Sequence, residues 1–103
     1  MNRAVVLSNQ RRIERDEVFH RTTVSIVGRP PQRALVVDLS PLGCMVRCEA
    51  AAERGQPISI ALPVTGQLDG NVIWAIMGRI GVEFAKPIGK ELYDSLLRLV
   101  KTP

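Results

Sequence analysis

The stretch QLDGNVIWAIMGRIGVEF, residues 67–84, contains two segments that favour β-structure, QLDGNVIWA and RIGVEF. A tight segment around Gly78 joins them. Two such segments separated by a short glycine-containing turn are typical of an antiparallel hairpin. We therefore expect a β-rich fold in which this hairpin pairs with further strands.

The preceding sequence supplies four more candidate strands, separated by Gly and Pro: TTVSIVG (22–28), RALVVDLS (33–40), CMVRCE (44–49) and PISIAL (57–62). Alternation with a period of two predicts which residues share a face. The predicted apolar faces are Val24 and Ile26; Leu35, Val37 and Leu39; Cys44, Val46 and Cys48; and Ile58, Ile60 and Leu62. About six short strands at this spacing predict a small antiparallel barrel or sandwich.

The period changes near the C-terminus, in PIGKELYDSLLRLVK (87–101). Apolar residues recur there every three or four positions: Ile88, Leu92, Leu96, Leu99 and Val100. This spacing predicts an amphipathic helix that starts after Pro87 and covers one end of the sheet structure with its apolar stripe.

Length and composition predict one globular domain over residues 1–103. The chain has 103 residues, of which 46% are hydrophobic and 23% are charged. We divide it into an N-terminal arm (1–17), a barrel (20–85) and the C-terminal helix (87–101). No apolar run reaches the roughly 18 residues of a membrane span, and no secretory signal is evident, so we expect a cytoplasmic protein without a membrane partner.

Cys44 and Cys48 are predicted to be small core residues in a reducing compartment. On one strand their Cα atoms would lie roughly 13 Å apart, whereas a disulfide requires less than about 7 Å. Zinc would need two further ligands, and His20 is the only histidine. We expect no metal and no catalytic constellation, hence no enzyme.

The net charge of +4 and the pI near 9.7 favour an anionic partner. Three arginines, Arg11, Arg12 and Arg15, lie in RRIERDEV (11–18), where three acidic residues balance them. The segment is either a solvated, self-neutralised stretch or a set of donors for an anion.

The second polar motif is DLSPLG (38–43), in which Asp38 and Ser40 are expected to project from one outward face and Ser-Pro-Leu-Gly fits a type I turn. Gly43 would allow a ligand to approach the backbone. Arginine binds phosphate and the O6/N7 edge of guanine, while a carboxylate accepts from guanine N1 and N2. The two motifs together therefore suit a guanine nucleotide.

RRIER followed by DLSPLG resembles the signature of the PilZ domain family, an RRxxR arm before a [D/N]xSxxG turn. GNVIWAIMGRIGVEF (70–84) is similar to the late hairpin of that family. The resemblance implies a six-stranded antiparallel β-barrel of the split-barrel type with a C-terminal helix. It also implies a receptor for the bacterial second messenger cyclic di-GMP that changes shape or partner contacts on binding.

By position, the resemblance assigns Arg11, Arg12 and Arg15 to phosphates and guanine edges, and Asp38 and Ser40 to the remaining guanine edge. Gly43 would permit close approach. In some relatives a residue at the position of Trp74 lies against a guanine, and the residue at the position of Gln10 influences how many ligand molecules bind.

Two other interpretations stay open from the sequence: a small basic barrel that binds RNA or DNA, and a module that binds only proteins. The scarcity of aromatic residues argues against the first, and the intact motifs argue against the second. We expect cyclic di-GMP as ligand, no cofactor, and a downstream protein partner.

Overall fold

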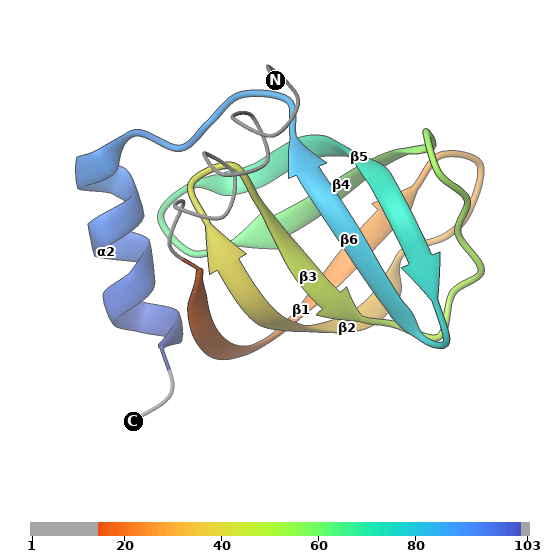
Figure 1. Cartoon of the computed structure of the whole chain (residues 1–103), viewed down its shortest axis with the longest axis horizontal. Coiled ribbons are helices and arrows are strands. Elements are labelled where there is room, and N and C mark those ends of the chain that lie inside the picture. The colour runs from red at the N-terminus through yellow and green to blue at the C-terminus, as the bar shows by residue number, and fades with distance from the viewer. Residues whose placement is uncertain (1–14, 102–103) are drawn as a thin grey trace, which may run out of the picture.

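Alternating apolar and polar side chains build six strands in the computed structural model, which describes residues 15–101 (Figure 1). The strands are β1 (Asp16–Ile26), β2 (Gln32–Ser40), β3 (Gly43–Arg47), β4 (Pro57–Leu62), β5 (Gly66–Ile76) and β6 (Arg79–Phe84). They form a closed barrel in the order β1-β2-β3-β6-β5-β4, and every neighbouring pair is antiparallel. The expected six-stranded antiparallel barrel is confirmed.

Every second side chain along a strand points into the barrel and fills its interior. The predicted inward faces of β1, β3 and β4 are buried as expected: Val24 and Ile26; Cys44, Val46 and the adjoining Cys48; Ile58, Ile60 and Leu62. Both cysteines are free thiols. Burial raises the pKa of the Cys44 thiol to about 12, with a smaller contribution from the nearby Asp38 carboxylate.

The hairpin from which the fold was predicted is present as β5 and β6. Ile76 pairs with Arg79 and leaves Met77 and Gly78 as a two-residue loop. Both loop residues have positive φ, 49° and 80°. This is the combination that a type I′ turn requires, which is why a glycine occurs there.

The predicted faces of β2 were partly wrong. Leu39 is buried, but Leu35 and Val37 are only half-buried, whereas Ala34 and Val36 point into the core. The register of β2 against β3 shifts between Val36 and Asp38. A β-bulge there inserts one residue and exchanges the inward and outward sides of the strand.

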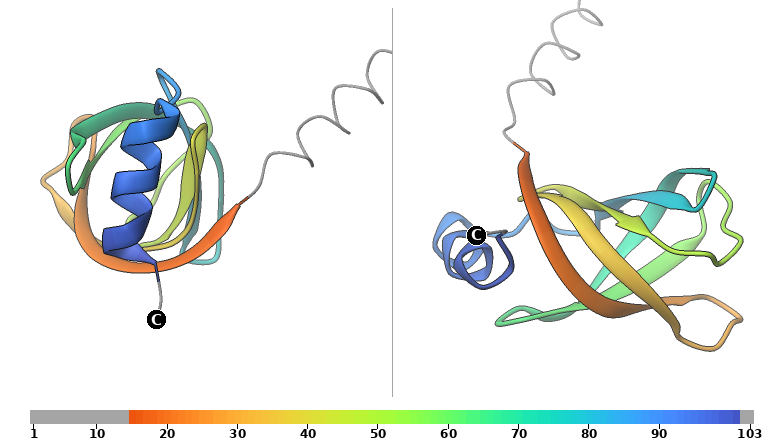
Figure 2. Two further views of the ribbon diagram at one scale, coloured as in Figure 1. Left: turned by 90° about the vertical axis from the view of Figure 1, so that its left-hand side faces the viewer. Right: turned by 90° about the horizontal axis from the view of Figure 1, so that it is seen from below.

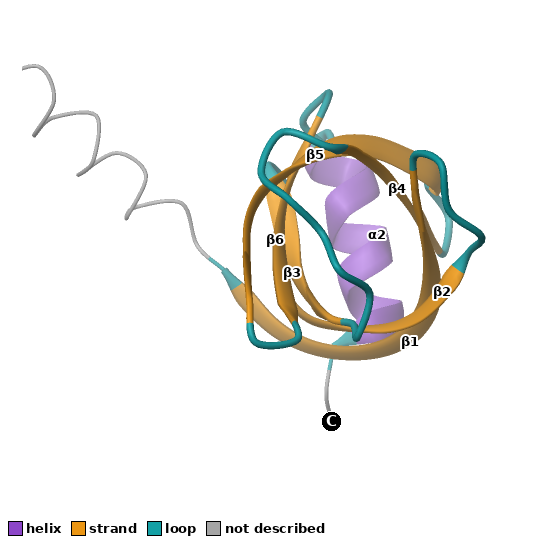
Figure 3. Cartoon of the chain, turned by 90° about the vertical axis from the view of Figure 1, so that its right-hand side faces the viewer, coloured by secondary structure: helices purple, strands orange, loops and turns teal. Residues whose placement is uncertain are grey.

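The C-terminal helix α2 (Lys90–Val100) lies across one mouth of the barrel (Figures 2 and 3). Tyr93, Leu96 and Val100 are its buried residues, and Ile88 is buried ahead of its first turn. The core role predicted for Leu92 and Leu99 was wrong, since they are 43% and 61% exposed. The apolar stripe is wider than the contact with the barrel, and the helix is rotated toward Tyr93.

Two element boundaries differ from the expected division. β1 begins at Asp16, inside the segment assigned to the arm, and α2 begins at Lys90 rather than directly after Pro87. Within residues 15–101, no helix has the length and apolar character that crossing a membrane would require.

Candidate functional site

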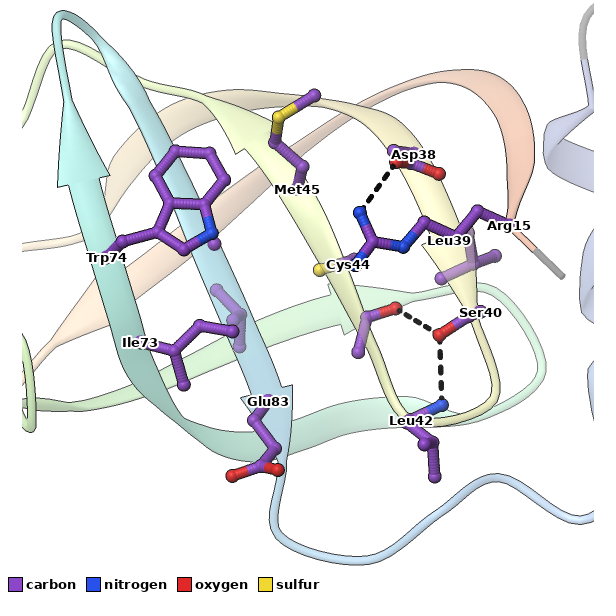
Figure 4. A pocket seen from close by; sticks show the side chains of 13 residues that line it. Arg15, Asp38, Leu39, Ser40, Leu42, Cys44, Met45, Ile73, Trp74 and Glu83 are labelled. Atoms are coloured by element: carbon purple, nitrogen blue, oxygen red, sulfur yellow. Dashed lines mark hydrogen bonds and ion pairs between the residues drawn. The ribbon is translucent and has the colours of Figure 1, made fainter. Parts of the chain in front are cut away.

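Four residues on four neighbouring strands form one row on the outer surface of the barrel. Asp38 of β2 pairs with Met45 of β3, and Met45 pairs with Gly81 of β6. Gly81 in turn pairs with Trp74 of β5. Figure 4 shows the Asp38 carboxylate and the Trp74 indole on opposite sides of the Met45 side chain. The row therefore has a polar end, an apolar middle and an aromatic end.

Two β-bulges aim the end residues of this row outward. Val36 and Val72 both point into the core, so an unbroken strand would place Asp38 and Trp74 inside as well. The register instead shifts between Val36 and Asp38 and between Val72 and Trp74. Each bulge thus turns one chemically useful side chain from the core to the surface.

The Trp74 indole lies on the backbone of Gly81. A Cβ at position 81 would overlap indole atoms, Nε1 and Cε2 among them. Glycine is therefore required for the ring to lie against the sheet. The half-buried ring keeps part of its surface accessible beside Met45.

Arg15 extends from the start of β1 toward Asp38 (Figure 4). Its Nη1 lies 3.7 Å from Asp38 Oδ2, and the two side chains are 73% and 23% exposed. This distance is an ion pair but too long for a direct hydrogen bond. The exposed guanidinium therefore keeps its donors available for a ligand.

The pKa of Asp38 is raised above its ordinary value, primarily because the carboxyl is partly removed from water. Arg15 and the Leu39 backbone act in the opposite direction, whereas the carboxylates of Asp16 and Glu17 raise the pKa further. The carboxylate thus lacks sufficient donors in the free protein, and a ligand that donates hydrogen bonds to it would stabilise its charged form.

The motif at residues 40–43 forms a two-residue hairpin turn between β2 and β3. Ser40 pairs with Gly43, and neither Pro41 nor Leu42 has positive φ, as a type I turn requires. The Ser40 hydroxyl accepts from the Leu42 N–H at 3.2 Å and donates to the Gly43 carbonyl at 3.5 Å. Ser40 is buried, with 8% of its surface exposed, and both hydrogen bonds of its hydroxyl are made within the turn.

The turn is also fixed from the C-terminal side of the chain. The Leu42 carbonyl accepts from the Phe84 N–H, and the Pro41 carbonyl accepts from the Ile88 N–H, both at 2.8 Å. Position 43 requires a glycine for a steric reason, since a Cβ there would overlap the Val82 carbonyl oxygen. Close packing of β3 against β6 therefore explains this glycine without a ligand.

Row and turn enclose a pocket of about 200 Å³. It brings together five residues expected from sequence: Arg15, Asp38, Ser40, Gly43 and Trp74. Arg11, Arg12 and Gln10 lie outside the described residues. The remaining lining was not predicted: Leu39, Leu42, Cys44, Met45, Ile73, Gly81, Val82 and Glu83. Met45 could have been found, because the two-residue loop after Ser40 places it opposite Asp38.

A hydrogen bond connects this side of the barrel to α2. The buried Tyr93 hydroxyl lies 2.6 Å from Asp16 Oδ2 and 3.0 Å from the Leu39 carbonyl oxygen, and it can donate to either. Asp16 and Leu39 are paired across β1 and β2 and are the chain neighbours of Arg15 and Asp38. The helix therefore holds the two strands that carry the ion pair.

Metal chemistry has no candidate ligands in residues 15–101, where no three His, Cys, Asp or Glu side chains gather in a suitable group. Arg15 is the only cationic side chain among the described residues that line the pocket, together with the carboxylates of Asp38 and Glu83. The pocket therefore offers hydrogen-bond donors and acceptors to a polar ligand.

Comparison with known proteins gave a consistent result. The model of the PilZ domain family matches residues 9–102. Comparison with curated protein sequences gave no significant match. Among solved structures, the chain is similar to the PilZ domain with c-di-GMP of YcgR from Escherichia coli. That likeness has a TM-score of 0.59 and 18% sequence identity, and it covers 88% of each chain.

Proposed function

Because this chain belongs to the PilZ domain family, we propose that it is a receptor for cyclic di-GMP and that the pocket below Arg15 and Asp38 holds part of this ligand. The observation that carries the proposal is the row from Asp38 to Trp74, with Arg15 paired to Asp38 at its polar end. The similarity to a solved PilZ domain with c-di-GMP supports the choice of nucleotide.

The chemistry of the row suits a guanine. The Asp38 carboxylate can accept from guanine N1–H and N2–H, and an exposed guanidinium can donate to O6 and N7 or to a phosphate. Met45 and the accessible part of the Trp74 ring offer apolar surface for the flat base. Each part of the ligand thus meets a group of matching character.

The pocket is smaller than the roughly 300–1,000 Å³ that enclose a drug-sized ligand, so we propose that it receives one guanine and that the rest of the nucleotide extends outward. Arg11 and Arg12, from the RRxxR motif, are then the donors for the phosphates and second guanine. The Ser40 hydroxyl maintains the turn, and its long contact with the Gly43 carbonyl lets its proton be redirected to the ligand.

We further propose a cytoplasmic binding module, not an enzyme, that passes its signal to a protein partner. The free, buried thiols of Cys44 and Cys48 support a reducing compartment. The binding character of the pocket, with no nucleophile–base pair among its described lining residues, supports a non-catalytic role. Calorimetric titration of cyclic di-GMP into the wild type, Arg15→Ala and Asp38→Ala tests the proposal.

A further inference from the structure

A second concave surface is lined by residues of β1, β2, β3, β6 and the turn between β5 and β6. That turn lies at the end of the barrel opposite α2 (Figure 1). Four exposed arginines line it, Arg21 of β1, Arg33 of β2, Arg47 of β3 and Arg79 of β6, which together we call the arginine face. The strand register places three of them in one row, since Arg21 pairs with Leu35, Leu35 with Arg47, and Arg47 with Arg79. The concavity is open to solvent and has a volume of about 830 Å³.

The positive charge of this face is not balanced within the described chain. Glu49 is the only acidic residue among the residues that line it. Neither of the two ion pairs formed between described residues includes any of the four arginines. Arg47 and Arg79 stand directly opposite each other across β3 and β6, and like charges in that position are destabilising. An anionic partner would convert this repulsion into attraction.

Apolar side chains are interleaved with the arginines. Met77, at the turn between β5 and β6, is 96% exposed, and Ile76, opposite Arg79, is 61% exposed. Leu35 lies between Arg21 and Arg47 in the row. Arginine and methionine are enriched at protein–protein interfaces, whereas lysine is depleted. The four cations of this face are all arginines.

We propose that the arginine face binds a protein partner through an acidic segment of that partner that also carries apolar side chains. Its carboxylates would pair with the four guanidinium groups, and its apolar residues would cover Leu35 and Met77. A nucleic acid fits less well, because no aromatic residue lines the described groove for stacking. The aromatic ring of Phe19 lies near this face but does not line it, and the Arg21 guanidinium lies over that ring, 5.5 Å from its centroid.

This face is the neighbour of the pocket described above. Arg47 and Ile76 come two residues after Met45 and Trp74, and Arg79 comes two residues before Gly81, in each case on the same strand as that member of the row. Residues two apart on a regular strand project from the same side. A partner seated on the arginine face would therefore lie beside the nucleotide pocket, although the proposal does not depend on which ligand that pocket binds.

The test is nuclear magnetic resonance mapping of the full chain, with a synthetic peptide of alternating glutamate and leucine as the probe. We expect shift changes at Arg21, Arg33, Arg47 and Arg79, and binding that weakens as salt rises. A lysine–leucine peptide is the reference probe and should not bind. Single-stranded DNA and anionic lipid vesicles test the other classes of partner.

Arginine-to-glutamine variants provide the second part of the test. The double variant Arg47→Gln/Arg79→Gln should bind the peptide about tenfold more weakly, with no loss of thermal stability because a repulsive pair is removed. Arg54→Gln/Arg98→Gln removes the same charge from exposed positions elsewhere and should leave binding unchanged. Equal weakening by both double variants, no binding of the peptide, or tighter binding of DNA or vesicles to this face would overturn the proposal.

Discussion

Asp38 and Trp74 each follow a β-bulge, and both lie in one cross-strand row on the outside of the barrel. Without the bulges the strand alternation would direct both side chains into the core, where Val36 and Val72 point. The pocket thus depends on two local irregularities of the sheet, on strands that are separated by β3 and β6. Its two ends can be perturbed independently.

The aromatic end is tested by Gly81→Ala. The added methyl group would overlap the indole of Trp74, and we expect the ring to be displaced from the sheet. The cost should be about 1–3 kcal/mol of unfolding free energy. Tryptophan fluorescence and denaturant unfolding measure the two effects. Gly89→Ala is the matched control, because a Cβ there meets open space, and an equal response of both variants would contradict the packing of Trp74 on Gly81.

The polar end is tested by Asp38→Asn. An acid whose pKa is raised in the folded state is easier to ionise in the unfolded chain. Asp38 therefore lowers stability as the pH rises above its ordinary pKa of 3.8. The variant lacks this loss, so the wild type should gain stability relative to it as the pH is lowered. Unfolding in denaturant at several pH values measures the difference, and a change of opposite sign would contradict the desolvation of Asp38.

The same variant should bind cyclic di-GMP more weakly. An asparagine presents one acceptor oxygen instead of two and places an amide donor against a guanine edge that itself donates. Weaker binding by a protein that is no less stable at neutral pH would separate a role in recognition from a role in folding. Undiminished binding would remove Asp38 from the site.

The link to α2 is tested by Tyr93→Phe, which removes the hydroxyl shared by Asp16 and the Leu39 carbonyl. We expect a loss of about 1–3 kcal/mol at neutral pH, since the buried Leu39 carbonyl and the half-buried Asp16 carboxylate lose their donor. Burial and the hydrogen bond to Asp16 raise the pKa of Tyr93. The wild type should therefore lose stability above the ordinary tyrosine pKa of 10.0, while the variant lacks this contribution. A wild type and a variant with parallel stability profiles at alkaline pH would contradict the account.

The role of Gly43 separates a steric requirement from a ligand contact. Gly43→Ala places a methyl group on the Val82 carbonyl oxygen, so we expect lower stability in the absence of any ligand. Thermal unfolding of the ligand-free protein measures it. An unchanged melting temperature together with weaker nucleotide binding would instead support the close-approach role inferred from the sequence.

Much of the fold could be predicted from alternation and turn chemistry. Gly78, in the two-residue loop Met77–Gly78, correctly predicted the hairpin of β5 and β6. The alternation of apolar and polar residues correctly predicted the buried faces of β1, β3 and β4. The bulge in β2 could not be predicted, because Val36 and Val37 are equally apolar and the sequence does not show which of them is the extra residue. The rotation of α2 was missed because the partners of the Tyr93 hydroxyl, Asp16 and the Leu39 carbonyl, lie on strands distant in the sequence.

The candidate site was only partly accessible from the sequence. Motifs indicated Arg15, Asp38, Ser40 and Gly43, all of which line the pocket. Gly81 and Ile73 carry no distinctive chemistry in the sequence, and only the pairing of β6 with β5 brings them to the pocket. The arginine face could not be predicted from the sequence either, because its four arginines lie on four different strands and only the strand register brings them together.

Calorimetric titration of cyclic di-GMP into the wild type, Arg15→Ala and Asp38→Ala tests the central claim most directly. Loss of one charge-assisted hydrogen bond costs about 1.5–3 kcal/mol, so each variant should bind roughly tenfold to a hundredfold more weakly. Arg98→Ala, on the exposed side of α2, should bind like the wild type. The account predicts clear binding by the wild type and strongly reduced binding by both pocket variants. Absence of binding by the wild type, or undiminished binding by both variants, would contradict it.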